Sequence, residues 1–235
     1  MSSVQPSVSK CVFPAVYRAG SVPAALMGGG ISPSISVNVD AISLGALSSW
    51  GSFSQGTAGA RPTSTASVFG SQKGVVFDGG DFLSASGLTY GTTAGSFVAV
   101  FKTPSAVSAR QCIYSVSDTA AANKWFEIGI DSDRRLYIEY NNAGTIQTIK
   151  GSTFLELSTA YVVAVCYDGT DWYVELDGVE ENPLTSDSVG TFAWMGAIDG
   201  TQVSTIGACT TSGGTSRYFS GSLAEIQIYS GDLTA

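Results

Sequence analysis

The chain has 235 residues, of which 44% are hydrophobic and only 13% charged, and its formal net charge is −8. Such an acidic chain is not expected to bind nucleic acid, since affinity for phosphate backbones requires clustered Lys and Arg. The absence of histidine excludes Ser-His-Asp triads and His-ligated zinc. The longest apolar runs are too short to cross a bilayer, so no membrane insertion is expected. One domain of this length is common among all-β proteins.

Residues 1–34 form the first distinct segment. They hold four of the seven prolines and the glycine triplet Gly28–Gly30. Because proline and glycine weaken internal strands, we expect an irregular N-terminal arm here and a folded domain over residues 35–235. The arm is either a loose terminus or a segment that orders against a neighbouring subunit. The run Val22–Met27 is too short and interrupted for a signal peptide, so folding in a cytosol is expected.

The rest of the chain shows no sustained helical period. Short β-branched or aromatic runs alternate with Gly, Asn, Asp and Ser, which predicts a sandwich or barrel. Residues 51–73, rich in Gly, Ser and Thr, are expected to form a long surface loop. The predicted strands are, in chain order, Ile35–Val39, Gly74–Phe77, Ser96–Lys102, Cys112–Val116, Trp125–Ile130, Arg135–Asn141, Thr145–Lys150, Ala160–Asp168, Asp171–Leu176, Thr205–Ala208 and Leu223–Tyr229.

Two Asp-Gly pairs predict tight hairpin turns, because this dipeptide tolerates the positive φ that such turns require. Asp168 and Gly169 lie between two predicted strands, and Asp177 and Gly178 directly follow the second of them. A similar turn is expected at Asn141–Gly144. The phase of the strands predicts a shared core that contains Phe77, Phe97, Ile130, Val163, Val165, Ile226 and Ile228.

Several of these landmarks resemble one family when taken in order. Trp50–Pro62 and Val75–Leu83 resemble stretches of its phage and bacterial versions, Ala160–Gly178 its central hairpin, and Phe219–Tyr229 its closing strand. The family is the concanavalin A-like lectin/glucanase superfamily, in its laminin-G-like form. The resemblance covers most of the chain and implies an all-β fold, a two-sheet antiparallel jelly-roll sandwich.

The superfamily includes glycoside hydrolases, so one acidic run has to be tested against their active strand. Glu175, Asp177 and Glu180 approach the spacing of that strand, and a retaining mechanism needs two carboxyl groups about 5–5.5 Å apart. A hairpin turn at Asp177-Gly178 would reverse the chain, so we do not expect Glu180 to share a face with Glu175. No catalytic residue is assigned, and the protein is expected not to be an enzyme. Glycoside hydrolysis stays the most distant alternative.

Acidic residues recur in loops, at Asp78–Asp81, Asp131–Asp133 and Asp168–Asp171. Calcium takes six to eight oxygen ligands, but none of these groups has a dedicated spacing. We therefore assign no metal ligand and no cofactor, with calcium at a loop rim as an alternative. Asp131–Asp133 lies beside Arg134 and Arg135 and is expected to be a neutralised turn.

Three aromatic residues, Trp194, Trp125 and Tyr218, are candidates for stacking on a carbohydrate. Trp194 ranks first because Gly190–Gly196 is a glycine-bounded connection. The alternative is that these side chains belong partly to the core or make protein–protein contacts.

The four cysteines lie far apart and form no CxxC pair. The simplest interpretation is reduced thiols that pack as small core residues. Two disulfides are the alternative, and sequence alone cannot choose among their three pairings. The residues are Cys11, Cys112, Cys166 and Cys209.

Two functions fit these observations. The phage-like form of Trp50–Leu83, the arm at 1–34 and the low charge favour a non-enzymatic virion protein of a tailed bacteriophage, a head-decoration, knob or fibre-like subunit assembled in the host cytoplasm. Its arm would dock onto capsid or tail proteins, it would form a homo-oligomer, and its sandwich could hold the particle to host glycans. The alternative is a free carbohydrate-binding module, a lectin.

Overall fold

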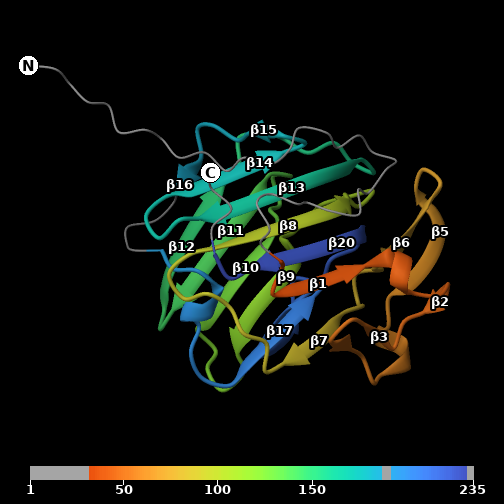
Figure 1. The fold of residues 1–235 in the computed structure, drawn as a ribbon, viewed down its shortest axis with the longest axis horizontal. Helices are drawn as coiled ribbons and strands as arrows, with labels where there is room; N and C mark the ends of the chain where they lie inside the picture. Colours follow the sequence, from red (N-terminus) through yellow and green to blue (C-terminus); the bar gives the residue numbers. More distant parts are fainter. Residues whose placement is uncertain (1–31, 187–191, 232–235) are drawn as a thin grey trace, which may run out of the picture.

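The structure is a computed structural model that describes residues 32–186 and 192–231. Its regular elements are β-strands and three short 3-10 helices, η1 (Val39–Ala41), η2 (Ala58–Ala60) and η3 (Met195–Ala197). Two large sheets lie one over the other (Figure 1). Every strand pair is antiparallel. The predicted all-β, two-sheet antiparallel sandwich is therefore confirmed.

Sheet 1 has the strand order β15-β14-β13-β8-β20-β6-β5-β2, with β1 paired to β20. It holds the predicted central hairpin, β13 and β14, and the closing strand β20, with β8 between them. Its strands are β1 (Ile35–Asn38), β2 (Gly45–Ala46), β5 (Thr63–Phe69), β6 (Gln72–Val76), β8 (Gly95–Lys102), β13 (Ala160–Tyr167), β14 (Trp172–Leu176), β15 (Val179–Glu180) and β20 (Ser222–Tyr229).

Sheet 2 has the order β16-β12-β11-β10-β9-β17-β7-β4-β3. A separate hairpin of β18 (Cys209–Thr211) and β19 (Gly214–Ser216) packs against β9 and β17 of this sheet. The strands of sheet 2 are β3 (Ser49–Trp50), β4 (Phe53–Ser54), β7 (Leu83–Ser86), β9 (Gln111–Asp118), β10 (Lys124–Ile130), β11 (Leu136–Asn142), β12 (Thr145–Lys150), β16 (Thr185–Ser186) and β17 (Gln202–Ile206).

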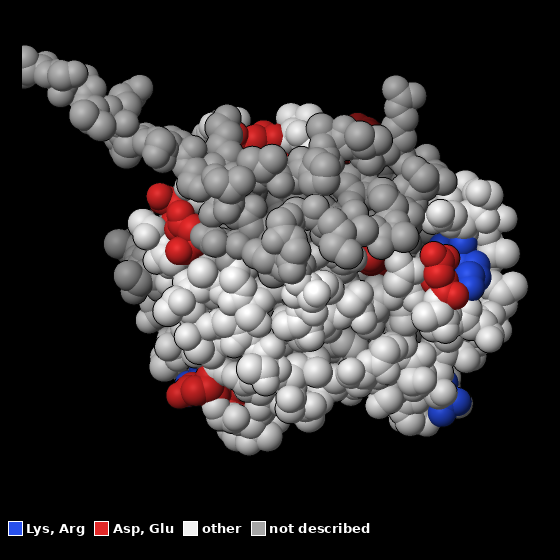
Figure 2. All heavy atoms as spheres, viewed as in Figure 1, with Lys and Arg blue, Asp and Glu red and all other residues white. Residues whose placement is uncertain are grey.

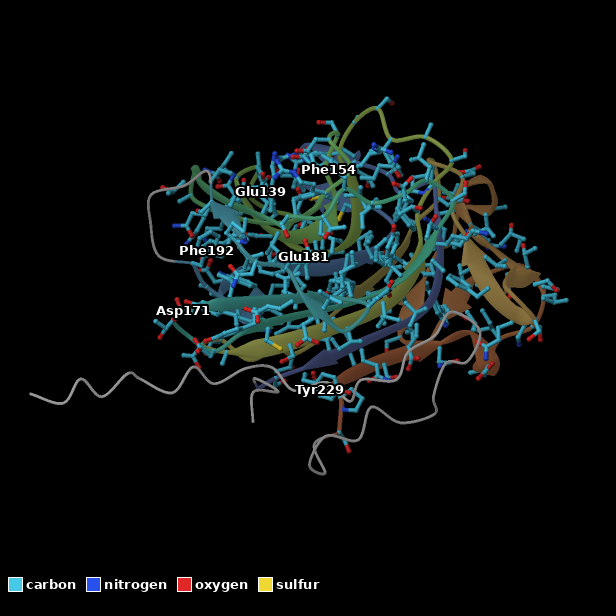
Figure 3. The ribbon with its side chains drawn as sticks, turned by 90° about the horizontal axis from the view of Figure 1, so that it is seen from above. Glu139, Phe154, Asp171, Glu181, Phe192 and Tyr229 are labelled. Atoms are coloured by element: carbon cyan, nitrogen blue, oxygen red, sulfur yellow. The ribbon has the colours of Figure 1, made fainter. Side chains whose placement is uncertain are left out.

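The core lies between the two sheets. Figure 3 shows the two layers from above, with Glu139 on the sheet 2 side and Tyr229 on the sheet 1 side. The predicted core residues are confirmed, since each of them is 0% or 1% exposed. Each such side chain contributes about 1.5–3 kcal/mol through burial. The face seen in Figure 2 carries charged side chains as small, separate groups, in keeping with the low charged fraction of the chain.

The predicted turns are confirmed. Gly169 has φ 103°, and Asp177 and Gly178 have φ 52° and 77°. The Asp168 carboxylate accepts hydrogen bonds from two backbone N–H groups of its own turn. The Asn141 side chain likewise accepts a hydrogen bond from the backbone N–H of Gly144.

Residues 51–73 do not form the long loop that their composition suggested. They include β4, η2 and the seven residues of β5, which pairs with β6. Ser64 and Phe69 of β5 are buried, so its Ser and Thr residues line a sheet instead of a loop. Small polar residues fit this position because β5 lies near the edge of sheet 1.

Two of the described cysteines agree with the simplest expectation and one does not. Cys112 and Cys209 are free and buried, whereas Cys166 is disulfide-bonded. Burial raises the pKa of Cys112 well above its usual value, and it raises the pKa of Cys209 to about 11.

Most of the expected arm at 1–34 lies outside the described residues. Within the described ranges, no helix has the length and apolar character needed to span a membrane.

Candidate functional site

The outer face of sheet 2, which points away from the core, carries acidic side chains on adjacent strands. Glu127 of β10 lies directly opposite Glu139 of β11, which in turn faces Thr148 of β12. The alternation of a strand explains this, because the flanking residues of Glu127, Phe126 and Ile128, point into the core. Both glutamates are nevertheless buried, with 0% and 2% of their surface exposed. Burial of two carboxylates requires charged partners.

Arg217 supplies the first partner. It follows β19 directly, so the small hairpin carries it over the outer face of sheet 2. Its Nη1 donates to Oε1 of Glu127 and, at 2.9 Å, to Oε1 of Glu139. One guanidinium nitrogen therefore joins the two buried carboxylates.

Arg110, just before β9, supplies the second partner. Its Nη1 donates to Oε2 of Glu139, and its Nε donates to Oδ1 of Asp131 at 3.1 Å. The Lys150 amine lies 2.5 Å from the other oxygen of Asp131. Burial alone would raise the pKa of Asp131, but the hydrogen bonds from Lys150, Ser132 and Arg110 outweigh it and lower the pKa to about 2. The three carboxylates are thus matched by three cations.

Two aromatic residues complete this group. The Trp125 indole donates from Nε1 to Glu139 at 3.1 Å, and the Arg217 guanidinium lies over its ring at 5.5 Å. The Tyr137 hydroxyl donates to Glu127 at 3.0 Å. Gly129 lies opposite Tyr137, and a Cβ at this position would come within 2.9 Å of the tyrosine ring. We call Arg110, Arg217, Glu127, Glu139, Asp131, Lys150, Trp125 and Tyr137 the arginine cluster.

The arginine cluster keeps binding capacity that its internal contacts do not use. The side chains of Arg110 and Arg217 are 28% and 29% exposed. Within the described part of the chain, Nη2 of Arg110 and both Nε and Nη2 of Arg217 make no hydrogen bond. Burial lowers the pKa of Arg217, yet a guanidinium stays protonated in proteins. Planar guanidinium groups with spare donors are suited to carboxylate or phosphate ligands.

The aromatic residues predicted as stacking platforms have three different positions. Trp194 is 0% exposed, so the expectation that its loop presents it to solvent is wrong. It packs against Phe126 and over Gly95, where a Cβ would come within 1.9 Å of the indole nitrogen. Trp125 lies in the arginine cluster and is half-buried, and Tyr218, next to Arg217, packs beside Phe82 with ring centroids 6.2 Å apart.

The sequence interpretation missed the four residues at the centre of the cluster. Alternation in β10 and β11 could have assigned Glu127 and Glu139 to one face, and the short turn between the strands could have set them opposite each other. No sequence signal indicated Arg110 and Arg217, because each lies in a connection far from the glutamates along the chain.

The acidic run after the central hairpin also differs from expectation. Glu175 and Glu180 are cross-strand partners on β14 and β15, so they do share a face, and the expectation that they would not is wrong. The reversal at Asp177-Gly178 causes this, since partners in an antiparallel pair point to the same side. The pair lies at the edge strands of sheet 1.

The other acidic residues are engaged in local structure. Asp133 pairs with Arg135 at 2.7 Å, so the turn at Asp131–Asp133 is neutralised as predicted. Asp131 itself pairs with Arg110 and Lys150 instead of the neighbouring arginines. Across residues 32–186 and 192–231, no three Cys, Asp or Glu side chains are grouped so that they could hold a metal ion.

Comparison with known proteins settles the family. A laminin G-like family model, described as the concanavalin A-like lectin/glucanases superfamily, matches residues 77–235, about two thirds of the chain. The chain belongs to the concanavalin A-like lectin/glucanase superfamily. Every residue of the arginine cluster lies inside the matched part of this superfamily member. No curated protein matches the chain.

Solved structures with the same fold include sugar-binding modules. The CBM40 module of a Ruminococcus gnavus sialidase, bound to α2,3-sialyllactose, matches with TM-score 0.52 and 18% identity over 60% of this chain and 78% of that one. Domain 4 of the Geobacillus stearothermophilus arabinanase AbnA, in complex with arabinotriose, matches with TM-score 0.54 and 17% identity over 77% and 79%. The Streptococcus pneumoniae sialidase NanB matches with TM-score 0.55 and 16% identity over 86% and 27%. These identities show a shared fold alone.

Proposed function

We propose that this domain binds carbohydrate, and that its arginine cluster takes an acidic sugar. The observation that carries the proposal is the spare donor capacity of Arg110 and Arg217, whose positions are fixed by buried carboxylates. A sugar carboxylate can accept two parallel N–H bonds from one guanidinium, and the fixed position lowers the entropy cost of binding. The half-buried Trp125 adds an aromatic edge beside the arginines. The sialyllactose and arabinotriose bound by the similar modules support a carbohydrate ligand.

The same contacts favour binding without turnover. Glycoside hydrolysis needs one protonated carboxylic acid and one free carboxylate on either side of the bond to be broken. Glu127 and Glu139 are buried, and Arg217 donates to both. Neither is therefore positioned as an acid or a nucleophile, and we propose a non-enzymatic role for the arginine cluster.

The test is calorimetric titration with α2,3-sialyllactose, with lactose as the ligand that lacks the acidic sugar. We expect saturable binding of sialyllactose and none of lactose. Arg217→Lys keeps the charge but loses the planar fork, and it should weaken binding at least tenfold. Arg135→Lys is the matched control, since Arg135 pairs with Asp133 outside the cluster. Equal affinity for both sugars, or an unchanged affinity in Arg217→Lys, would contradict the proposal.

A second proposal is a structural role in a phage virion, as a homo-oligomer that docks on capsid or tail proteins and is assembled in the host cytoplasm. Its support is the resemblance of Trp50–Leu83 to phage versions of the family. In the fold these landmarks are core residues, such as Trp50 and Leu83, so the resemblance concerns the scaffold. Deletion of residues 1–34 tests this role. Loss of incorporation into particles would support docking through the arm, and unchanged incorporation would contradict it.

A further inference from the structure

The outer face of sheet 1, which points away from the core, is buried along its centre. Val98 of β8, Ala164 of β13 and Tyr229 of β20 lie on this face, because the residues beside them in each strand point into the core. They form a small apolar cluster of their own and are 3%, 6% and 1% exposed. We call these three residues the outer apolar cluster. The outer face of a sheet normally contacts water, so another part of the chain must cover this cluster.

Cys166 lies on the same face and is also buried. It is paired with Ser96 of β8, whose hydroxyl donates to its Sγ at 3.2 Å. Cys166 is disulfide-bonded, whereas Cys112 and Cys209 are free. Since the sequence has four cysteines, Cys11 is the partner that remains within the chain.

The described part of the chain begins close to Cys166. The backbone N–H of Ser34 donates to a carbonyl oxygen of β20 at 2.8 Å, beside Tyr229. Tyr229 is paired with Ser96, the partner of Cys166. Three strand spacings therefore separate β1 from Cys166, which is about 14 Å. About five extended residues span this distance, so residues 12–31 are more than long enough to reach it.

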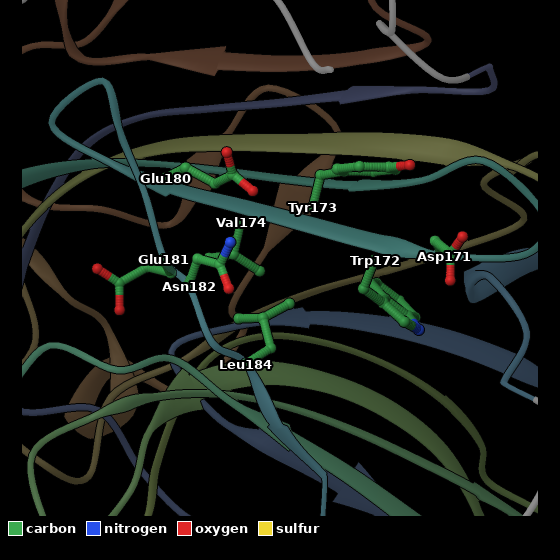
Figure 4. A pocket seen from close by; sticks show the side chains of 8 residues that line it. All are labelled: Asp171, Trp172, Tyr173, Val174, Glu180, Glu181, Asn182 and Leu184. Carbon is green, nitrogen blue, oxygen red and sulfur yellow. The ribbon is translucent and has the colours of Figure 1, made fainter. Parts of the chain in front are cut away.

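The side of this face nearest β14 is acidic. Glu175 of β14 is paired with Ala164 and shares its face. Glu180 of β15 is in turn opposite Glu175. Figure 4 shows Glu180 and Tyr173 on the same side of β14, and Trp172 on the other side. Two carboxylates therefore border the outer apolar cluster.

The amino acids that precede residue 32 complement this face. Lys10 and Arg18 carry the only charged side chains among the first 31 residues, and both are cations. Apolar residues lie between them, at Val12–Phe13 and Val16–Tyr17. Lys10 directly precedes Cys11, so a bond from Cys11 to sheet 1 would bring a cation near the carboxylates of β14 and β15.

We propose that residues 1–31 are a strap that docks on the outer face of sheet 1 of their own domain, with Cys11 bonded to Cys166. Apolar side chains of the strap cover the outer apolar cluster, and Lys10 pairs with the carboxylates at its border. The strap is independent of the acidic-sugar site, because the arginine cluster lies on the outer face of sheet 2.

The bond that locks the strap forms by oxidation. The thiols of Cys11 and Cys166 together give two electrons and two protons to a disulfide oxidant such as oxidised glutathione, which leaves as two thiols. In a reducing cytosol both cysteines remain thiols. The strap is therefore locked only where the chain meets such an oxidant.

Peptide mapping of the full chain after incubation with oxidised glutathione tests the bond. Trypsin and a Glu-specific protease, used without reductant, should release Cys11–Arg18 joined to Leu157–Glu175 from the monomer, with the other two cysteines alkylated. A free Cys166 thiol, or Cys166 joined to any other partner, would overturn the proposal. The same peptide pair found only in covalent dimers would also overturn it, because the arm would then dock on a second copy.

Hydroxyl-radical labelling of Tyr229 tests whether the strap covers the face. The variant with Cys11→Ser, Lys10→Glu and Arg18→Glu has no tether, and its strap has the same sign of charge as the border. Tyr229 should then be labelled about fivefold faster than in the wild type, while Tyr114 in the core stays protected and shows that the fold is kept. The matched control, Cys11→Ser with Lys10→Arg and Arg18→Lys, keeps the charges and should show a smaller increase. Equal labelling of Tyr229 in the wild type and both variants would overturn the proposal.

Discussion

The two faces of β10 and β11 are almost equally buried, yet different forces hold them. On the inner face, Phe126, Ile128 and Ile138 pack in the core with 3% exposure or less. On the outer face, Glu127 and Glu139 are buried to the same degree by arginines. Apolar packing is non-directional and stabilises in proportion to area. A buried ion pair has to recover the desolvation of both charges and is weak evidence for stability.

The comparison indicates what the outer face is for. A sandwich of this size could cover that face with apolar residues at lower cost, since replacement of buried ion pairs by apolar groups is often stabilising. The arginine cluster instead keeps guanidinium donors that no described residue uses. We infer that the inner face maintains the fold, and that the outer face maintains the geometry of a ligand site.

The largest expected effect on stability comes from removing one partner of the buried ion pairs on the outer face. Arg217→Ala leaves Glu127 and Glu139 buried without their shared partner, and it should lower the free energy of unfolding by about 3–5 kcal/mol. Urea denaturation measures this loss, with Arg135→Ala as the control at about 1 kcal/mol or less. The double variant Arg217→Met with Glu127→Gln should recover much of the loss. A double variant as unstable as the single one would show that charge matching is not what holds this face.

On the inner face, the loss of stability caused by a substitution should depend on the size of the side chain and not on its charge. Ile138→Ala should cost about 2–5 kcal/mol, because it leaves a cavity between the sheets. Ile138→Leu keeps the volume and should cost less than about 1.5 kcal/mol. On the outer face, Glu139→Gln also keeps the volume but removes the charge that two arginines share. Thermal unfolding should rank Glu139→Gln as more destabilising than Ile138→Leu, and the reverse order would break the distinction between the two faces.

A smaller effect should appear with pH. The pKa of Asp131 is lowered from 3.8 to about 2. Its ionised form therefore stabilises the fold at every pH above the pKa that this carboxyl group has in the unfolded chain. This contribution, about 2 kcal/mol at most, is present near pH 5 and is lost as pH falls from about 4 through 2. Unfolding measured across this range should show a steeper loss in the wild type than in Asp131→Asn. Parallel curves would mean that the Lys150 and Arg110 contacts do not stabilise Asp131.

The sequence predicted the inner face much better than the outer face. Alternation placed Phe97 and Ile228 in the core, and Asp-Gly pairs placed the turns, because both signals are local. The arginine cluster depends on contacts between distant segments, since Arg217 is 90 residues from Glu127 along the chain. The prediction for Trp194 was wrong for the same reason. Its glycine-bounded segment is typical of an exposed loop, and the contact with Phe126 that helps to bury the indole comes from a distant part of the chain.

The central claim is that the arginine cluster uses its spare donors to hold a carboxylate. A crystal structure of the domain with an acidic trisaccharide tests this most directly. We predict the sugar carboxylate within about 3 Å of Nε or Nη2 of Arg217, with the contacts of Arg217 to Glu127 and Glu139 retained. A sugar bound elsewhere with the guanidinium groups still facing solvent would contradict the account.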